Sequence, residues 1–194
     1  MLKTIHAAAE AGQTDDVLRF IAQGTRVNDR DVRGRTPLMA AVHGNKPETA
    51  STLIEAGADV NIQDQRLDNM LLYASAEGLR KMVELAIKAG ADTRLTNRFG
   101  GTALIPASDR GHVDIVEILL KCTDVDVNHI NNLGWTALLE AVILGDGGTR
   151  HQQIVALLLQ HGADRLITDR DGITALAHAR RHHYKEMERM LTQS

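Results

Sequence analysis

Residues 131–148 read Asn-Asn-Leu-Gly-Trp-Thr-Ala-Leu-Leu-Glu-Ala-Val-Ile-Leu-Gly-Asp-Gly-Gly, a stretch that holds one copy of a recurring unit and the largest departure from it. The step at residues 135–138 recurs at residues 35–38, 101–104 and 173–176, and more weakly at residues 68–71. Lys3 takes the Thr position in the first copy, one residue out of phase. The equivalent positions 3, 36, 69, 102, 136 and 174 are 33, 33, 33, 34 and 38 residues apart. A period near 33 predicts a stack of six supersecondary units.

Each unit carries start and stop signals for two helices. Side-chain oxygens at the repeated position can cap a helix start, and the residues concerned are Thr36, Asn69, Thr102, Thr136 and Thr174. Nine residues later stand Gly12, Asn45, Gly78, Gly111 and Gly145, which suit the left-handed conformation that ends a helix. A second stop falls at Gly24, Gly57, Gly90 and Gly162. In the fourth unit Thr123 replaces this glycine, and in the sixth His183 replaces the first one.

The period, the Thr-Pro-Leu step at residues 36–38 and the Gly-Ala-Asp-Val-Asn run at residues 57–61 together resemble ankyrin repeats. The resemblance covers nearly the whole chain, and the segments 98–101, 134–136 and 145–148 more narrowly resemble small bacterial ankyrin-repeat proteins. It implies an all-α solenoid of six helix-turn-helix repeats joined by β-turn fingers. We expect a single domain with repeats at about 1–33, 34–64, 65–97, 98–131, 132–169 and 170–194.

Composition narrows the class of protein. The 194 residues are 43% hydrophobic and 24% charged, which is enough to bury a core. The net charge is −3 and basic residues are mixed with acidic ones, so nucleic acid is not the expected partner. No apolar run is long enough to span a membrane. One cysteine cannot form an internal disulfide, which favours a reducing, cytoplasmic location.

No set of residues suggests catalysis, a cofactor or a metal. Cys122 ends an apolar helix, where we expect it to pack, since no histidine is placed to activate it. His178 and His182 have the spacing of two metal ligands on one helix face, but they lack a clear third ligand. A solvated terminal face explains them as well. We therefore expect that this protein is not an enzyme.

The segment 145–150 contains five extra residues relative to the other repeats. Backbone N–H groups of a Gly-rich loop can bind an anion, and Gly147, Gly148 and Arg150 are the candidates for such a site. The alternative is an elongated surface turn whose removal would leave the fold intact. An anion or nucleotide sensor is therefore the second candidate function.

By resemblance, the fingers and first helices form the face that binds partners. Phe99 and Trp135 lie on adjacent fingers, although aromatic residues make up only 3% of the chain. Packing against a neighbouring finger is the alternative for both. Selected positions on this face carry seven arginines against four acidic residues, although pairing within the face would neutralise some of them.

We expect a monomeric protein-interaction module that docks an acidic segment of a protein partner. Arginine offers a planar fork that suits carboxylates. The predicted partner-binding residues are Trp135, Phe99, Leu133, Arg66, Arg98 and Arg110. The identity of the partner does not follow from these residues.

Overall fold

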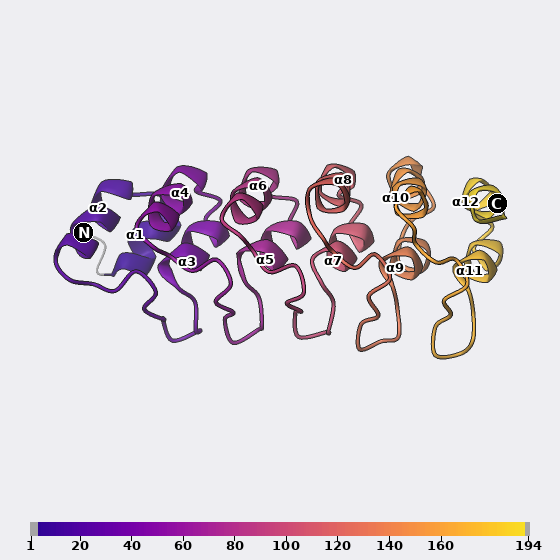
Figure 1. The fold of residues 1–194 in the computed structure, drawn as a ribbon, viewed down its shortest axis with the longest axis horizontal. Helices are drawn as coiled ribbons and strands as arrows, with labels where there is room; N and C mark the ends of the chain where they lie inside the picture. Colours follow the sequence, from indigo (N-terminus) through magenta and orange to yellow (C-terminus); the bar gives the residue numbers. More distant parts are fainter. Residues whose placement is uncertain (1–3, 193–194) are drawn as a thin grey trace. The chain divides into compact units, whose positions relative to one another are not determined.

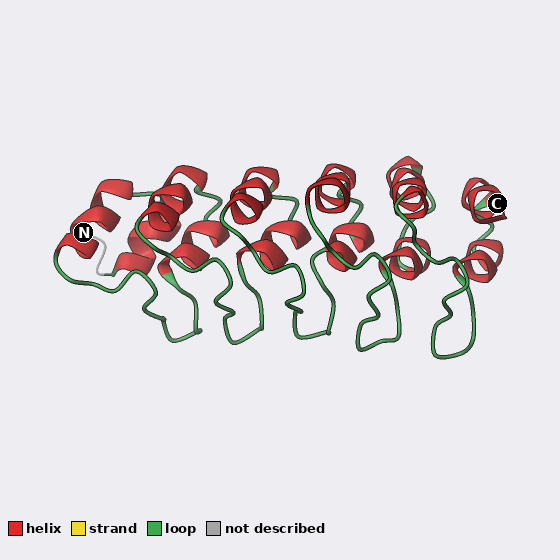
Figure 2. Ribbon diagram, viewed as in Figure 1, coloured by secondary structure: helices red, strands yellow, loops and turns green. Residues whose placement is uncertain are grey.

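The computed structural model describes residues 4–192, which form twelve α-helices in six consecutive contacting pairs (Figure 1). Beyond an isolated bridge between Thr168 and Thr174, this part of the chain consists of helices and loops (Figure 2). The helices are α1 (Ile5–Ala11), α2 (Thr14–Ala22), α3 (Pro37–His43), α4 (Pro47–Glu55), α5 (Met70–Ala76), α6 (Arg80–Lys88), α7 (Leu104–Asp109), α8 (Val113–Cys122), α9 (Ala137–Ile143), α10 (Thr149–Gln160), α11 (Ala175–Arg181) and α12 (Lys185–Thr192).

The chain divides into two compact units, the first ending at Leu95 and the second beginning at Thr96. In the first unit, α1, α3 and α5 pack side by side as one layer, and α2, α4 and α6 form another. The second unit repeats this arrangement, with α7, α9 and α11 in one layer and α8, α10 and α12 in the other. Whether the whole chain forms a single domain, as the repeat pattern predicts, stays a prediction.

Asparagine side chains join successive repeats within each unit. The Oδ1 atom of Asn28 accepts the Asp59 N–H at 3.0 Å, and its Nδ2 group donates to the Gly57 carbonyl at 3.4 Å. Asn61 makes the same two contacts in the first unit, with Asp92 and Gly90, and Asn128 makes them in the second, with Asp164 and Gly162. One side chain thus satisfies both a donor and an acceptor of the next repeat, which sets the register between them.

The predicted helix starts are confirmed at four positions. Side-chain oxygens of Thr36, Asn69, Thr136 and Thr174 each accept the backbone N–H three residues later. In the first repeat Thr4 caps α1, whereas Lys3, to which we assigned this position, lies outside the described residues.

The cap predicted at Thr102 is wrong, and its buried hydroxyl has no hydrogen-bond partner in the described residues. The Ile105 N–H bonds the Thr102 backbone carbonyl at 3.2 Å instead, and α7 begins two residues after Thr102.

The second-helix stops at Gly24, Gly57, Gly90 and Gly162 are confirmed by φ values of 91°, 92°, 80° and 88°. The first helix of the fifth repeat ends where predicted, since α9 stops at Ile143, but the left-handed conformation expected at Gly145 occurs at Gly147, with φ 70°. A Cβ atom at Gly145 would stand 2.2 Å from the Ala141 carbonyl oxygen, so the glycine permits a close approach there. His183 adopts the left-handed conformation, with φ 60°, where glycine was expected.

The first helices supply most of the core. All six residues 37–42 of α3 and 137–142 of α9 are buried, whereas α2 buries only Val17 and α8 buries one face. Alanines in the first helices allow the neighbouring helices of a layer to approach closely. Within this apolar series Glu140 is an acidic exception.

We expect Gly90→Ala to destabilise the protein by about 1 kcal/mol, because alanine is strained at positive φ. No atom lies within 4 Å of a Cβ built at Gly90, so backbone conformation alone carries the cost. Gly101→Ala is the matched control, since Gly101 has no positive φ and its Cβ would meet the Ile105 side chain at an ordinary 3.5 Å. Urea unfolding that is the same for Gly90→Ala and the parent would contradict this assignment.

Candidate partner-binding site

The five fingers 31–35, 64–68, 97–101, 131–135 and 169–173 share one hydrogen-bond pattern. The first residue of each finger, which we call the root, is Asp31, Asp64, Asn97, Asn131 or Asp169. A side-chain oxygen of the root accepts the backbone N–H groups two and four residues later, at 2.8–3.1 Å. The root N–H donates to the carbonyl of the last finger residue. Each tip is therefore held in one conformation, which fixes where its side chains point.

Two exposed apolar side chains occupy the same position on adjacent fingers of the second unit. Phe99 and Leu133 each follow their root by two residues, and they are 51% and 47% exposed. The Asn132 N–H donates to the Phe99 carbonyl at 2.9 Å, so the two tips are joined directly. The guanidinium of Arg98 lies 4.5 Å from the centre of the Phe99 ring. The structure thus brings three of the predicted residues together.

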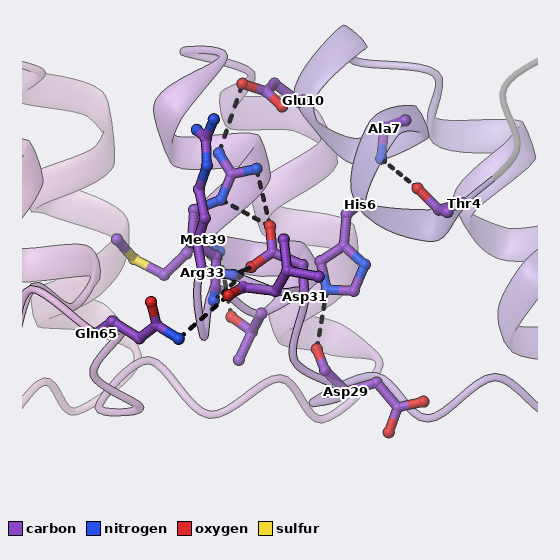
Figure 3. Close-up of polar contacts among 12 residues, drawn as sticks. Thr4, His6, Ala7, Glu10, Asp29, Asp31, Arg33, Met39 and Gln65 are labelled. Atoms are coloured by element: carbon purple, nitrogen blue, oxygen red, sulfur yellow. Dashed lines mark hydrogen bonds and ion pairs between the residues drawn. The ribbon is translucent and has the colours of Figure 1, made fainter.

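Trp135 lies two residues beyond Leu133 and is half-buried. Its backbone N–H donates to the Asn131 side chain at 3.0 Å. The position equivalent to Trp135 in the first finger is Arg35, which is only 9% exposed. Arg35 pairs with Asp31 at 2.9 Å and with Glu10 at 3.6 Å (Figure 3). Trp135 is therefore partly exposed at the base of its finger, and its backbone closes the turn.

The arginine excess on this face is partly neutralised by internal pairing. Besides Arg35, Arg66 lies 4.0 Å from Asp68 while remaining exposed. Arg170 donates to the Asn132 carbonyl and lies against the neighbouring finger. Arg98 and Arg110 are exposed in the second unit, whereas Arg66 belongs to the first. The prediction of one patch that includes Arg66 is therefore not tested.

Glu140 is a site residue that the sequence analysis missed. It lies on α9, is 6% exposed, and accepts a 2.7 Å hydrogen bond from Nδ2 of Asn131. Burial and the negative charge of Asp109 raise the pKa of Glu140 to about 7, against the opposing effect of the Asn131 bond. Burial also raises the pKa of Asp109, although Arg110 and His151 act in the other direction. The available signal was an acidic residue inside an apolar helix, nine residues after a finger root.

The Gly-rich insertion is packed on both sides. Tyr184 donates from its hydroxyl to the Gly145 carbonyl at 2.9 Å, and a Cβ at Gly147 would lie 2.3 Å from the tyrosine ring. The buried His151 contacts the Asp146 carboxylate at 2.8 Å and the Asp109 carbonyl at 2.9 Å. The structure therefore does not support the expectation that the segment can be deleted with the fold intact, because its removal would break these contacts.

The proposed anion site at Gly147, Gly148 and Arg150 has an acidic group at its centre. The Asp146 carboxylate accepts the Gly148 N–H at 2.9 Å, which holds the pKa of Asp146 below its usual range. An incoming anion would meet this negative charge. Arg150 is exposed at the start of α10. The alternative of an anion sensor stays a prediction, and this arrangement does not favour it.

The two histidines and the cysteine considered as candidate metal ligands or nucleophile lie in surroundings that do not indicate such chemistry. His178 lies 2.7 Å from the Asp169 carboxylate, whereas His182 stacks on the Tyr184 ring at 5.2 Å. Within residues 4–192, no cluster of three or more His, Cys, Asp or Glu side chains could hold a metal. Cys122 is exposed at the end of α8, so the expectation that it serves as a packing residue is wrong.

Comparison with known proteins agrees with the repeat geometry. A family model described as ankyrin repeats in three copies matches residues 2–64 and 71–169. The chain belongs to the ankyrin-repeat family. A crystal structure of an ankyrin repeat domain from Acinetobacter baumannii has a TM-score of 0.93 and 50% identity, covering 96% of this chain and 95% of that one. The ankyrin repeat protein EF0377 has a TM-score of 0.93 and 38% identity, covering 100% of this chain and 98% of that one.

A third relative matches only in part. Over 73 residues the chain is 48% identical to YahD of Escherichia coli K12, a protein named for its ankyrin repeats. The match covers 38% of this chain and 36% of YahD, so it spans little more than a third of that relative. The all-α ankyrin fold and the similarity to bacterial ankyrin proteins, both predicted from the sequence, are confirmed.

Ankyrin repeats are a general protein-interaction module and typically serve as non-enzymatic scaffolds. In the described part of this ankyrin chain, no helix is both long and apolar enough to cross a membrane. The finger position two residues after the root differs between the two units. Arginine occupies the position in the first two fingers, at Arg33 and Arg66, before Phe99 and Leu133 replace it.

We expect Glu140→Gln to stabilise the protein at pH 8 by as much as about 3 kcal/mol. The folded-state pKa of Glu140, about 7, lies above its ordinary value of 4.5, so folding favours the protonated form. The resulting loss of stability develops as pH rises from 4.5 towards 7 and persists above 7. Urea unfolding at pH 5, 6, 7 and 8 measures it.

Glutamine keeps the acceptor for Asn131 and removes the charge, so the variant should lose most of the parent's decline across this range. Glu117→Gln on α8, where Glu117 is partly exposed and paired with Lys121, is the control. A variant that is less stable than the parent at pH 8 would show that the ionised carboxylate stabilises the fold.

Proposed function

We propose that this ankyrin-repeat chain binds an acidic segment of a protein partner along the fingers of its second unit. The observation that carries the proposal is the apolar step made by Phe99 and Leu133, which are exposed at equivalent positions on two hydrogen-bonded fingers. Monomeric proteins usually leave large apolar side chains exposed singly. Two such side chains on rigid adjacent turns are well suited to anchor one short peptide.

Charge beside the apolar step supports an acidic partner. Arg98 is exposed and its guanidinium stacks on the Phe99 ring, which holds the charged group beside the anchor. A carboxylate from the partner could accept charge-assisted hydrogen bonds from it, and an apolar contact nearby would exclude water and strengthen them. Arg110 is exposed one residue after Asp109, and we propose a second, more peripheral contact there.

Rigid fingers also reduce the entropic cost of binding. The root hydrogen bonds already hold the backbone around Phe99 and Leu133, so docking would order few additional dihedral angles. Trp135 would add contact area through the exposed part of its ring. Arg66 in the first unit remains part of the proposal as a separate contact.

We also make three proposals about the domain organisation, oligomeric state and location of the protein. We propose that the repeats form one domain, that the chain acts as a monomer, and that it works in the cytoplasm. The first follows from the continuous repeat period, and the last from the lone Cys122.

Binding should depend on Phe99 and Leu133 much more than on other exposed apolar residues. Peptides selected from a random ten-residue display library would supply the probe, and their affinity would be measured by calorimetry. We expect Phe99→Ala or Leu133→Ala to weaken binding by about 2 kcal/mol, roughly 30-fold, with little change in melting temperature. Leu166→Ala, at a side chain that is 75% exposed elsewhere in the same unit, should bind like the parent.

Arg98→Ala should cost less and make the affinity less sensitive to salt, since an exposed charge contributes chiefly through screened attraction. Trp135→Ala should weaken binding by about 2 kcal/mol and also lower the melting temperature, because its ring is half-buried. If the peptides selected from the library contain no acidic residues, the proposal that the partner segment is acidic is wrong. Equal affinity for the parent, Phe99→Ala and Leu133→Ala would remove the site itself.

A further inference from the structure

A chain of two hydrogen bonds links a buried carboxyl group on α9 to the finger that bears Leu133 and Trp135. Oε1 of Glu140 accepts from Nδ2 of Asn131 at 2.7 Å. Oδ1 of the same Asn131 side chain accepts the N–H groups of Leu133 at 2.9 Å and Trp135 at 3.0 Å. Asn131 is itself buried, so its amide has few alternative partners. Whatever changes the acceptor strength of Glu140 therefore acts on the finger through a single side chain.

This arrangement distinguishes one finger from the other four. The residue nine positions after the root is Ala40, Tyr73, Pro106 and His178 in the other repeats, and Glu140 here. In finger 169–173 the roles are reversed. Its root, Asp169, is the acidic residue, and it faces the imidazole of His178 at 2.7 Å. Only in finger 131–135 does a neutral root amide donate to a carboxyl group at this position.

We propose that Glu140 is a proton-operated positioning residue, which changes the presentation of Leu133 and Trp135 through Asn131 when it gains or loses a proton. The evidence for the switch itself is the hydrogen bonds that Asn131 makes with Glu140, Leu133 and Trp135. Its effect on partner binding rests on the function proposed above.

The groups around Glu140 place its titration in the neutral range. Burial, together with the negative charge of Asp109 on α7, raises the pKa of Glu140 to about 7. Arg110 on α7 and His151 on α10 act on Asp109 and favour its ionised form. On α11, His178 already faces the Asp169 carboxylate. Within residues 4–192 no cationic side chain forms an ion pair with Glu140, so a proton is the group that relieves its repulsion from Asp109.

The direction of the effect follows from hydrogen-bond cooperativity. An ionised carboxylate is a stronger acceptor than a carboxylic acid, so deprotonation of Glu140 pushes electron density through the Asn131 amide towards its oxygen. The amide oxygen then becomes a stronger acceptor for the N–H groups of Leu133 and Trp135. We expect these hydrogen bonds to tighten, and the tip to become more ordered, as pH rises through about 7.

Trp135 is the only tryptophan in the chain, which gives the test an intrinsic reporter. The backbone amide shifts of Leu133 and Trp135 would be followed by nuclear magnetic resonance from pH 5 to 9 on the intact protein, together with tryptophan emission. In the parent, both amide protons should move downfield with a common midpoint near pH 7. Glu140→Gln should abolish this transition, because glutamine keeps the acceptor but cannot titrate.

Two further variants complete the design. Asp109→Asn removes the neighbouring charge, so the midpoint should fall towards the ordinary glutamate value of 4.5. Glu117→Gln, at the partly exposed carboxyl group paired with Lys121, should leave the transition unchanged. Helical circular dichroism would check that each variant is folded. Asp109→Asn tests the assignment independently if Glu140→Gln does not fold.

The proposal fails if the parent shows no transition of these amides between pH 5 and 9. It also fails if the transition survives in Glu140→Gln, which would assign it to one of the histidines, or if Asp109→Asn leaves the midpoint in place. None of these measurements uses a partner, so their outcome is separate from that of the proposed function. Peptide affinity at pH 6 and pH 8, for the parent and Glu140→Gln, would then show whether the switch affects binding.

Discussion

The hydrogen bonds of the finger roots are the constraint on which the binding surface depends. A turn of five residues exposes several backbone N–H groups, and an unsatisfied donor costs free energy wherever water is excluded. One side-chain oxygen at the root accepts two of these donors in every finger. Because that acceptor belongs to a short side chain, Asp or Asn, the turn closes tightly and the tip has one conformation. The residues at the tip can then vary without loss of the turn.

The two units use this freedom differently. In the first unit, Arg35 at the base of its finger is buried in ion pairs with Asp31 and Glu10, so its charge is neutralised inside the fold. In the second unit the equivalent position is Trp135, and the tips carry Phe99 and Leu133. The same backbone therefore holds a buried ion pair at the base of finger 31–35 and exposed apolar side chains on fingers 97–101 and 131–135. An ankyrin repeat needs only its root, caps and core for stability, which leaves such positions available for recognition.

Glu140 and Asp109 in the second unit are expected to lower the stability of the protein, and the ankyrin fold does not require an acid at position 140. Glu140 stands in a helix whose neighbouring positions are apolar and buried, and the negative charge of Asp109 opposes its ionisation. An alanine at this position, as in the second repeat, would pack without that penalty. Buried acids with a raised pKa are frequent at functional sites. Its bond to Asn131 connects it directly with the finger that carries Leu133 and Trp135.

The sequence by itself determined the fold class, the number of repeats and most of the helix ends. These follow from local chemistry, since a threonine caps the helix that starts beside it and a glycine such as Gly90 relieves strain at its own φ. It also identified Phe99, Leu133 and Arg98, because tip positions can be counted from the repeat. Only the tertiary structure decided which charges are neutralised, how Tyr184 packs on the insertion, and that Glu140 lies beside Asp109 and bonds Asn131. Those properties arise from side chains brought together from different repeats, and their distances and burial depend on packing that no local pattern encodes.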